Sequence, residues 1–232
     1  MQTQIAIDGP AASGKSTVAK LLAELLGAYY INTGEMYRTL AWACLRQGID
    51  PKEAPESLTS LLPSWSLTLS PLSKNQVEII FNGSVVPTQE LRTPQVAAIV
   101  SFVAKIPAVR SWMLDTQRNC RSLGTIIMEG RDIATVVLPD ATAKFFVTAT
   151  PRTRAKRRLR QPGEVPEGAT LESVEQEIAR RDEIDSTREI APLKPADDSV
   201  IIYSDNLTPR QVADIIIYVY KSKLNECGSS AI

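Results

Sequence analysis

The amino-acid sequence predicts an α/β fold with a five-stranded parallel sheet and helices on both faces. Five short, nearly continuous apolar segments, at residues 4–8, 28–31, 125–128, 144–149 and 199–203, are separated for the most part by segments with helical spacing of apolar residues. This alternation is typical of a parallel sheet buried on both faces. In such sheets ligands bind beyond the carboxyl ends of the strands, so the loops after these segments are examined for polar residues.

The loop after the first predicted strand, GPAASGKST at residues 9–17, fits the pattern G-x-x-x-x-G-K-[ST]. In this pattern backbone N–H groups surround a phosphate, the lysine reaches the β- and γ-oxygens, and the hydroxyl binds Mg²⁺. Apolar residues with helical spacing follow at 16–27, so a helix N-terminus with its positive partial charge faces the same phosphate. A glycine-rich turn without a ligand would have to match the spacing and both flanks by chance. The predicted phosphate site comprises Gly9, Pro10, Ala11, Ala12, Ser13, Gly14, Lys15, Ser16 and Thr17, with Ser16 as the metal ligand.

Composition narrows the class of protein. The 232 residues suffice for one domain, 1–232, and 26 basic against 26 acidic residues give no overall charge that would indicate nucleic acid or a membrane as a partner. No signal peptide or long apolar run is present, so we expect a cytoplasmic protein, and we expect a monomer. Three widely spaced cysteines indicate reduced thiols. Because histidine is absent, any proton acceptor must be a carboxylate.

Residues 64–89 depart from the parallel pattern. The segment 66–70 alternates with period two, and residues 76–86 carry an Asn82-Gly83 pair between two strand-like runs, which is a strong hairpin signal. A small antiparallel unit is therefore predicted as an insert at about 63–100. It is either an acceptor-binding lobe or a purely structural flap.

Two polar motifs follow predicted strands. In NTGEMYR, residues 32–38, Thr33 can cap a helix and place Tyr37 and Arg38 one turn further on, although an ordinary cap with a surface arginine has the same pattern. In EGRDIATVVLPDA, residues 129–141, Arg131 and Asp132 stand where a plain turn would more often have Gly, Asn or Ser. The alternative interpretation of this second motif is a solvated ion pair.

A third motif lies on the helix predicted from residue 171. Its apolar stripe of Leu171, Val174 and Ile178 continues onto three charged residues, Arg181, Asp185 and Arg188. Because charged side chains are rarely buried without partners or a ligand, the helix is expected to run into a polar cleft. An exposed ion pair with i,i+4 spacing is the alternative.

The segment PRTRAKRRLR, residues 151–160, has six basic residues within nine positions. Pro151 suits the first turn of a helix that would expose Arg154, Arg157 and Arg158, and the loop after it could move. We predict a mobile lid at about 152–168 whose arginines approach the transferred phosphoryl group, rather than a solvated face or a nucleic-acid patch.

With these motifs the chain resembles the bacterial-type cytidylate kinases, which are nucleoside monophosphate kinases with the P-loop kinase fold. The resemblance rests on residues 7–17, 32–38, 90–110, 128–141 and 179–198, and it is most specific in EGRDIATVVLPDA together with RRDEIDSTREIAPL. It implies transfer of the γ-phosphate of ATP to CMP or dCMP with Mg²⁺. The catalytic residues implied are Lys15, Arg131, Arg188 and Arg157, and the residues implied for CMP are Thr33, Tyr37, Arg38, Ser101, Arg110, Arg131, Asp132, Arg181, Asp185 and Arg188.

Within that resemblance, Arg38, Arg131 and Arg188 would hold the acceptor phosphate, Arg181 and Asp185 would meet the sugar, and Ser101, Arg110 and Asp132 would meet the cytosine edge. A carboxylate at Asp132 accepts from the amino group of cytosine, whereas uracil would present a second acceptor. An unpaired buried polar group costs about 1–3 kcal/mol, so UMP should be disfavoured by about one to two orders of magnitude. No general base is needed, because the acceptor phosphate is already anionic.

The chain departs from the family pattern at Asn32, usually Asp, at Glu35, usually Ala, and at Ala12, often Gly. Glu35 places a negative charge near an anionic acceptor. Two other classes of protein are disfavoured by the sequence. A switch GTPase would need N-K-x-D and D-x-x-G motifs, which the sequence lacks, and a nucleic-acid-binding protein is disfavoured by the neutral net charge. Another small-molecule kinase with the same loop remains possible.

Overall fold

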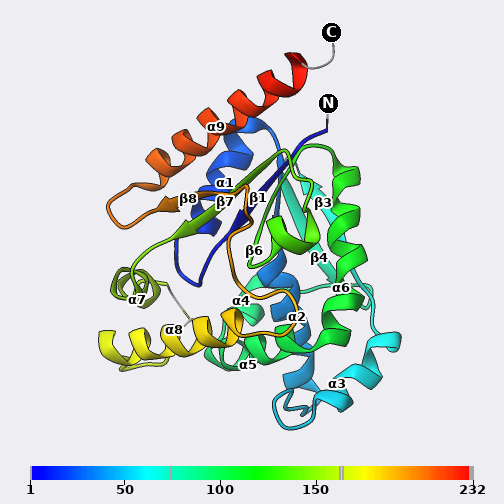
Figure 1. Ribbon diagram of the computed structural model, residues 1–232. Helices are drawn as coiled ribbons and strands as arrows, with labels where there is room; N and C mark the ends of the chain where they lie inside the picture. The colour runs from blue at the N-terminus through cyan, green and yellow to red at the C-terminus, as the bar shows by residue number, and fades with distance from the viewer. Residues whose placement is uncertain (1, 74, 162, 164, 230–232) are drawn as a thin grey trace.

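The fold, a computed structural model that describes residues 2–73, 75–161, 163 and 165–229, centres on a parallel sheet with the strand order β2-β6-β1-β7-β8 (Figure 1). All five strands lie where the sequence predicts them and all pairs are parallel. Their bounds are β1 Gln4–Asp8, β2 Tyr29–Asn32, β6 Ile126–Gly130, β7 Ala143–Thr148 and β8 Val200–Tyr203.

Helices cover both faces of this sheet. One face packs against α1 (Lys15–Leu26) and the long α9 (Pro209–Ser229) through the apolar side chains of Val18, Leu22 and Ile216, among others. The opposite face is covered by the π-helical turn η3 (Ile133–Val137) and the 3₁₀ turn η2 (Cys120–Leu123). α1 is capped by Gly27, whose φ of 64° is the left-handed conformation that favours glycine.

The predicted insert forms a separate three-stranded antiparallel sheet with helices around it. Its strands are β3 (Leu67–Ser73), β4 (Gln76–Phe81) and β5 (Ser84–Val85), and β4 turns into β5 through Asn82 and Gly83, both with positive φ. The helices are α2 (Thr33–Arg46), α3 (Pro55–Leu61) with the 3₁₀ turn η1 (Leu62–Ser64), α4 (Thr88–Leu91), α5 (Pro94–Lys105) and α6 (Pro107–Asn119). One apolar cluster joins α2, α5 and α6 to this sheet, so the insert has its own core.

The basic segment and the charged helix pack against each other. α7 (Pro151–Leu159) and α8 (Leu171–Ser186) share a small apolar cluster of Ala155, Val174 and Ile178. The predicted exposure of Arg154 and Arg158 is wrong, because both side chains are buried. This face of α7 is turned toward the loop after β1 and toward α8. There Arg154 donates to the carbonyl oxygen of Ala11 and to the carboxylate of Asp182. The predicted lid includes residues 162 and 164, which lie outside the described residues, and its motion stays a prediction.

Two further expectations can be compared with the fold. Cys44 and Cys120 are free and buried, whereas the side chain of Cys227 lies outside the described part. Within the described ranges no single helix is long and apolar enough to cross a membrane, and one bent pair, Pro94–Lys105 with Pro107–Leu123 at 93°, meets that criterion of length and composition.

Candidate active site

The loop after β1 is shaped by residues with left-handed backbone. Gly9 and Gly14 have φ values of 146° and 95°. A Cβ on Gly9 would stand 2.0 Å from the carbonyl oxygen of Val147 in the neighbouring strand, so only glycine fits there. Ala12 has φ 56°, which explains why glycine is the usual residue at this position of the family pattern.

Lys15, the first residue of α1, is buried inside this loop. Its Nζ donates to the carbonyl oxygen of Pro10 at 2.7 Å and to Ser13 Oγ at 3.4 Å. Burial, and then the nearby guanidinium of Arg131, lower the pKa of Lys15 to about 7. Among the described residues no carboxylate lies at hydrogen-bond distance from Lys15 Nζ, and a phosphate would supply the negative charge.

Asp8, at the end of β1, fixes the turn that follows β6. Its Oδ1 and Oδ2 accept from the backbone N–H groups of Ile133 and Ala134 at 2.8 and 2.7 Å. Burial is the main reason that the pKa of Asp8 is raised to about 7. Because these bonds hold the start of η3, Asp8 places Arg131 and Asp132 at the carboxyl edge of the sheet.

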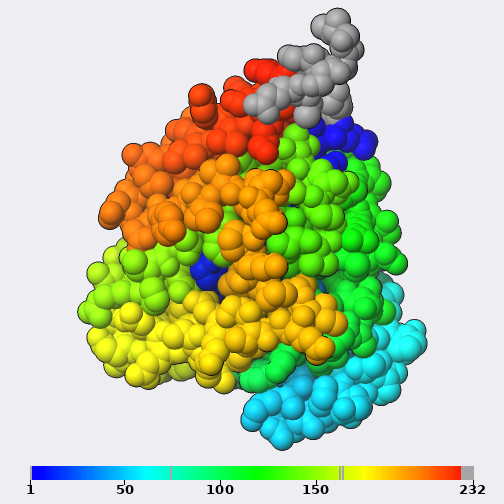
Figure 2. All heavy atoms as spheres, in the orientation of Figure 1, coloured from blue at the N-terminus to red at the C-terminus, as the bar shows by residue number. Residues whose placement is uncertain are grey.

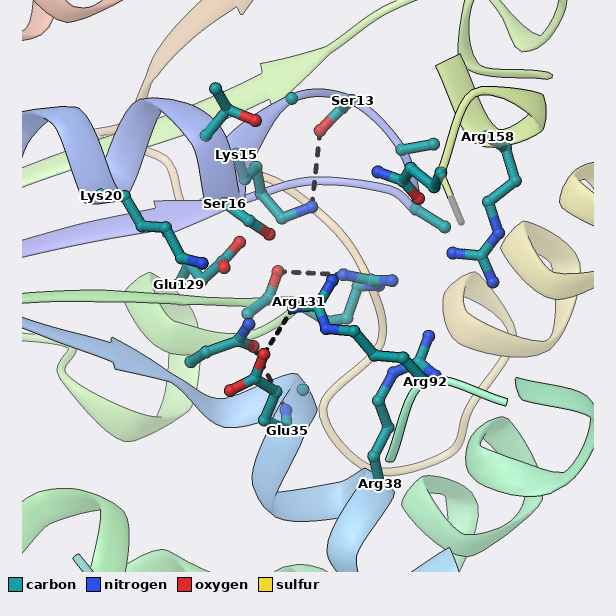
Figure 3. Close-up of a pocket in the computed structure, with 18 of the residues that line it drawn as sticks. Ser13, Lys15, Ser16, Lys20, Glu35, Arg38, Arg92, Glu129, Arg131 and Arg158 are labelled. Atoms are coloured by element: carbon teal, nitrogen blue, oxygen red, sulfur yellow. Dashed lines mark hydrogen bonds and ion pairs between the residues drawn. The ribbon is translucent and has the colours of Figure 1, made fainter. Parts of the chain in front are cut away.

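In front of the loop lies a cavity of about 500 Å³ that is lined mainly by charged side chains. Figure 3 shows Arg38, Arg92, Arg131 and Arg158 arranged around the space in front of Lys15 and Ser16. In the surface view, residues near the N-terminus are visible at the bottom of a hollow between the lid segment and the chain that leads to β8 (Figure 2). Of the residues predicted for the phosphate site, Ala11 to Thr17 line this cavity, whereas Gly9 and Pro10 do not.

A smaller cavity of about 50 Å³ adjoins the large one and shares Gly34, Gly130, Arg131 and Arg181 with it. Most of the residues predicted for the acceptor meet here, although they come from α2, α5, the turn after β6, α8 and the segment that follows α8. The predicted residues that line it are Thr33, Tyr37, Ser101, Arg131, Asp132, Arg181, Asp185 and Arg188. Arg38 instead lines the large cavity, where its NH1 donates to the carbonyl oxygen of Leu91 at 3.0 Å.

The charged end of α8 forms the floor of the smaller cavity. Asp185 accepts from Arg131 Nε at 2.9 Å, and its Oδ1 lies 3.9 Å from Arg188 NH1. Burial would raise the pKa of Asp185, but Arg131, Arg181 and Arg188 hold it below its ordinary value. Burial, and then the charge of Arg131, lower the pKa of Arg181 to about 9. The Nε atoms of Arg181 and Arg188 are buried and have no hydrogen-bond partner in the described protein.

Asp132, which lines this cavity, is paired with Arg110, which lies behind it. Arg110 NH2 donates to Asp132 Oδ2 and NH1 donates to the carbonyl oxygen of Ala104 at 3.2 Å. The guanidinium of Arg110 also lies 5.6 Å from the ring centre of Tyr37. Asp132 is thus paired with Arg110, and Arg131 is paired with Asp185, so the alternative of a solvated ion pair at Arg131 and Asp132 is wrong.

The N-terminus of α2 differs from the prediction in its capping residue. Asn32 is the N-cap, and its Oδ1 accepts from the N–H of Glu35 at 3.2 Å. Thr33 is already the first residue of the helix, and its hydroxyl donates to the carbonyl oxygen of Glu129 at 2.9 Å. The helix begins one residue earlier because Thr33 is needed to join α2 to the end of β6.

The arginines of α7 divide between two environments. Arg157 donates to the carbonyl oxygens of Ser13 at 3.1 Å and Ser204 at 2.6 Å, and so ties the phosphate loop to the end of β8. It does not line either cavity described above, whereas Arg158 lines the large one. Arg154 donates to Asp182 at 2.5 Å and to the carbonyl oxygen of Ala11 at 3.3 Å. A catalytic role for Arg157 stays a prediction.

Three residues near the site were not predicted from the sequence: Asp8, Glu129 and Arg92. Arg158, in contrast, is one of the lid arginines predicted to approach the phosphoryl group, and it lines the large cavity. Glu129 is buried and accepts from the hydroxyl of Tyr30. The one available signal was position, because Asp8 and Glu129 each stand at the carboxyl end of a predicted strand. Arg92 comes from the insert, and no local pattern indicates that its side chain reaches the phosphate loop.

Together, the glycine loop after β1, the helix behind it and the cation-lined cavity at the carboxyl edge of a parallel sheet define the P-loop kinase fold. The profile of one family, described as "Cytidylate kinase", matches residues 5–222. This chain belongs to that family.

The similar proteins fall into two groups by length: some are about as long as this chain, and others are about twice as long. The cytidylate kinase of Pelotomaculum thermopropionicum is 43% identical over 92% of this chain and 93% of its own, and that of Oceanobacillus iheyensis is 40% identical over 96% of each. A bifunctional pantoate ligase/cytidylate kinase of Synechococcus sp. (strain CC9311) is 42% identical over 96% of this chain, which spans 45% of that longer protein. A solved shikimate kinase from Bacteroides thetaiotaomicron is 12% identical with a TM-score of 0.48, over 95% of this chain and 98% of its own.

Proposed function

We propose that the protein transfers the γ-phosphate of ATP to CMP or dCMP, giving CDP or dCDP. The observation that carries this proposal is the pair of adjoining cavities. The large cavity lies at the phosphate loop, and the small one is lined by the buried carboxylates of Asp132 and Asp185. Arg131 and Arg181 line both cavities. A donor in the large cavity and an acceptor in the small one would bring their phosphates together between these two guanidinium groups.

The acceptor assignment rests on unsatisfied charge and on Asp132. The buried Nε atoms of Arg181 and Arg188 without partners favour an anionic ligand, because a buried donor left unpaired is costly. In this proposal Arg38, Arg131 and Arg188 hold the acceptor phosphate, and Arg181 and Asp185 meet the sugar. Ser101 and Asp132 face the base, where the carboxylate of Asp132 favours the amino group of cytosine over the carbonyl of uracil.

Catalysis in this proposal consists of positioning and charge neutralisation. The acceptor phosphate is already an anion, so the side chains need not remove a proton from it. Lys15 at the donor phosphates, with Arg131 and Arg188 at the acceptor, would stabilise the negative charge spread over the transferred group. Arg158, which lines the large cavity, is a further candidate for this role beside the predicted Arg157.

The donor set at the phosphate loop fits Mg²⁺. Ser16 supplies a hydroxyl beside the cavity, and Mg²⁺ prefers a few protein oxygens together with phosphate oxygens and water. The described residues contain no group of three His, Cys, Asp or Glu that could hold a metal. When bound, the ion would neutralise phosphate charge. A cytoplasmic location and a monomeric state belong to the proposal and rest on sequence pattern alone.

The test is ADP release with ATP and Mg²⁺, with CMP, dCMP, UMP, AMP or no acceptor in parallel reactions. We expect turnover with CMP and dCMP to exceed that with UMP by about one to two orders of magnitude, because UMP would leave buried polar groups unpaired. Release that is equal with and without an acceptor, or highest with AMP, would contradict the proposal. A different preferred acceptor would indicate another small-molecule kinase.

A further inference from the structure

Glu35 and Arg92 form an ion pair inside the large cavity. Arg92 NH2 lies 2.5 Å from Glu35 Oε1, and both residues line the space in front of the phosphate loop (Figure 3). The side chain of Arg92 is 33% exposed and that of Glu35 is 20% exposed, so solvent screens the pair only in part. Glu35 lies in the first turn of α2, whereas Arg92 follows α4 in the insert.

The charge of Glu35 is unusual in its surroundings. Seven lysine and arginine side chains and three glutamates line the large cavity. Of these glutamates, Glu129 is held by the hydroxyl of Tyr30, and Glu24 is exposed. Glu35 alone among the three forms an ion pair with one of the cavity's arginines within the described residues. The N-terminus of α2 stabilises a negative charge at this place, and the bond from the N–H of Glu35 to Asn32 fixes its backbone there.

Arg92 also stands where three parts of the molecule meet. Its side chain reaches α2 through Glu35, and its own backbone belongs to the connection between α4 and α5 of the insert. A Cβ built on Gly163, in the predicted lid, would lie 2.9 Å from the carbonyl oxygen of Arg92. The Arg92 side chain thus joins the insert to α2, and its backbone lies beside Gly163.

We propose that the Glu35 carboxylate competes with the acceptor phosphate for the guanidinium of Arg92. This competition lowers the affinity for the acceptor. A carboxylate and a phosphate both accept hydrogen bonds from a guanidinium, and both are anions. An acceptor bound in the smaller cavity extends its phosphate into the large one, where its oxygens replace the Glu35 carboxylate on Arg92. Glu35 is thus a residue that tunes acceptor affinity, and this inference rests on the proposed function.

The competing explanation is that Glu35 merely positions Arg92 or joins α2 to the insert. The chain offers a matched control for that explanation, because Glu90 of α4 also joins the insert to α2. Glu90 Oε2 accepts from Trp42 Nε1 at 2.7 Å and lies 3.7 Å from Arg46 NH1, away from both cavities. If Glu35 only joined the two elements, replacing Glu90 would change acceptor binding in the same way.

The experiment compares the full-length wild-type protein with Glu35→Gln, Glu35→Ala and Glu90→Gln. Glutamine keeps the size of the side chain and can still accept a hydrogen bond from Arg92, so Glu35→Gln removes the charge alone. We expect Glu35→Gln and Glu35→Ala to lower KM for CMP about three- to fivefold, which corresponds to the loss of a partly exposed ion pair. The Kd for CMP measured by calorimetry should fall equally, and Glu90→Gln should change neither value.

A double-mutant cycle with Arg92→Ala identifies the partner. If Glu35 acts by occupying Arg92, the effect of Glu35→Gln on KM disappears when Arg92 is already alanine. An effect that persists in that background overturns the inference, as does a rise in KM for Glu35→Gln or an equal fall for Glu90→Gln.

The proposed function is decided separately, by whether the wild-type protein turns over CMP. A Kd for CMP that Glu35→Gln leaves unchanged overturns the inference whether or not turnover occurs.

Discussion

The buried pair between Arg110 and Asp132 allows a prediction whose magnitude follows from the structure. Both side chains are almost fully buried, at 7% and 5% exposure. Replacing Asp132 with alanine leaves the Arg110 guanidinium buried without its carboxylate partner, with the carbonyl oxygen of Ala104 as a remaining acceptor. The substitution therefore removes a charge partner as well as a group that could read the base.

The expected cost is that of breaking a buried ion pair, about 3–5 kcal/mol of the free energy of unfolding. For a chain of this length, about 2–4 °C in Tm corresponds to each kcal/mol, so Asp132→Ala should lower Tm by about 6–20 °C. The double variant Arg110→Met/Asp132→Leu should recover much of the loss, because it leaves no unpaired buried charge.

The assay is thermal and urea unfolding followed by circular dichroism without nucleotide. The control is Asp140→Ala, which removes the partner of Arg121 in a pair whose carboxylate is 66% exposed. An exposed pair contributes about 0–1 kcal/mol, so this variant should stay close to the wild type.

Equal Tm values for Asp132→Ala and Asp140→Ala would refute the reasoning. So would a double variant less stable than Asp132→Ala. If Asp132→Ala is as unstable as expected, base selectivity is better tested with Asp132→Asn, which keeps the shape of the side chain.

Two further predictions concern the phosphate loop. Asp8→Ala leaves the buried N–H groups of Ile133 and Ala134 without their acceptor, at about 1–3 kcal/mol each, so urea unfolding should show a loss of about 2–6 kcal/mol. A loss below about 1 kcal/mol would contradict this role. Burial, and then Arg131, lower the pKa of Lys15 to about 7, so Lys15 is mostly neutral at pH 8 and ATP binding should take up protons there. Calorimetry in buffers of different ionisation enthalpy measures this uptake, which should shrink below pH 7, and no proton exchange at pH 8 would disprove it.

Local sequence patterns predicted the parts of the fold that depend on local geometry. The spacing of Gly9, Gly14 and Lys15 predicted the loop, because the loop needs a positive φ at both glycines and this need is visible in the local sequence. The Asn82-Gly83 pair predicted the hairpin for the same reason. The five apolar segments predicted the strands, since a strand buried on both faces needs apolar residues throughout its length.

Local sequence patterns did not predict burial or capping where the partner of a polar side chain lies far away in the sequence. Apolar spacing on α7 predicted that Arg154 and Arg158 would be exposed, and both are buried. Arg154 is satisfied by Asp182, which is 28 residues away, and by the carbonyl oxygen of Ala11, which is 143 residues away. The choice of Asn32 instead of Thr33 as the cap of α2 depended in the same way on the distant carbonyl oxygen of Glu129.

The sequence by itself determined the class of site: a phosphate loop after the first strand and charged residues at the ends of later elements. Only the tertiary structure decided how those charges are paired. It joined Arg110 to Asp132 and Glu35 to Arg92, and it placed Asp8 under the turn that carries Arg131. The physical reason is that burial of a charge is tolerable only beside a partner, and the partner is brought there by the packing of elements far apart in the chain.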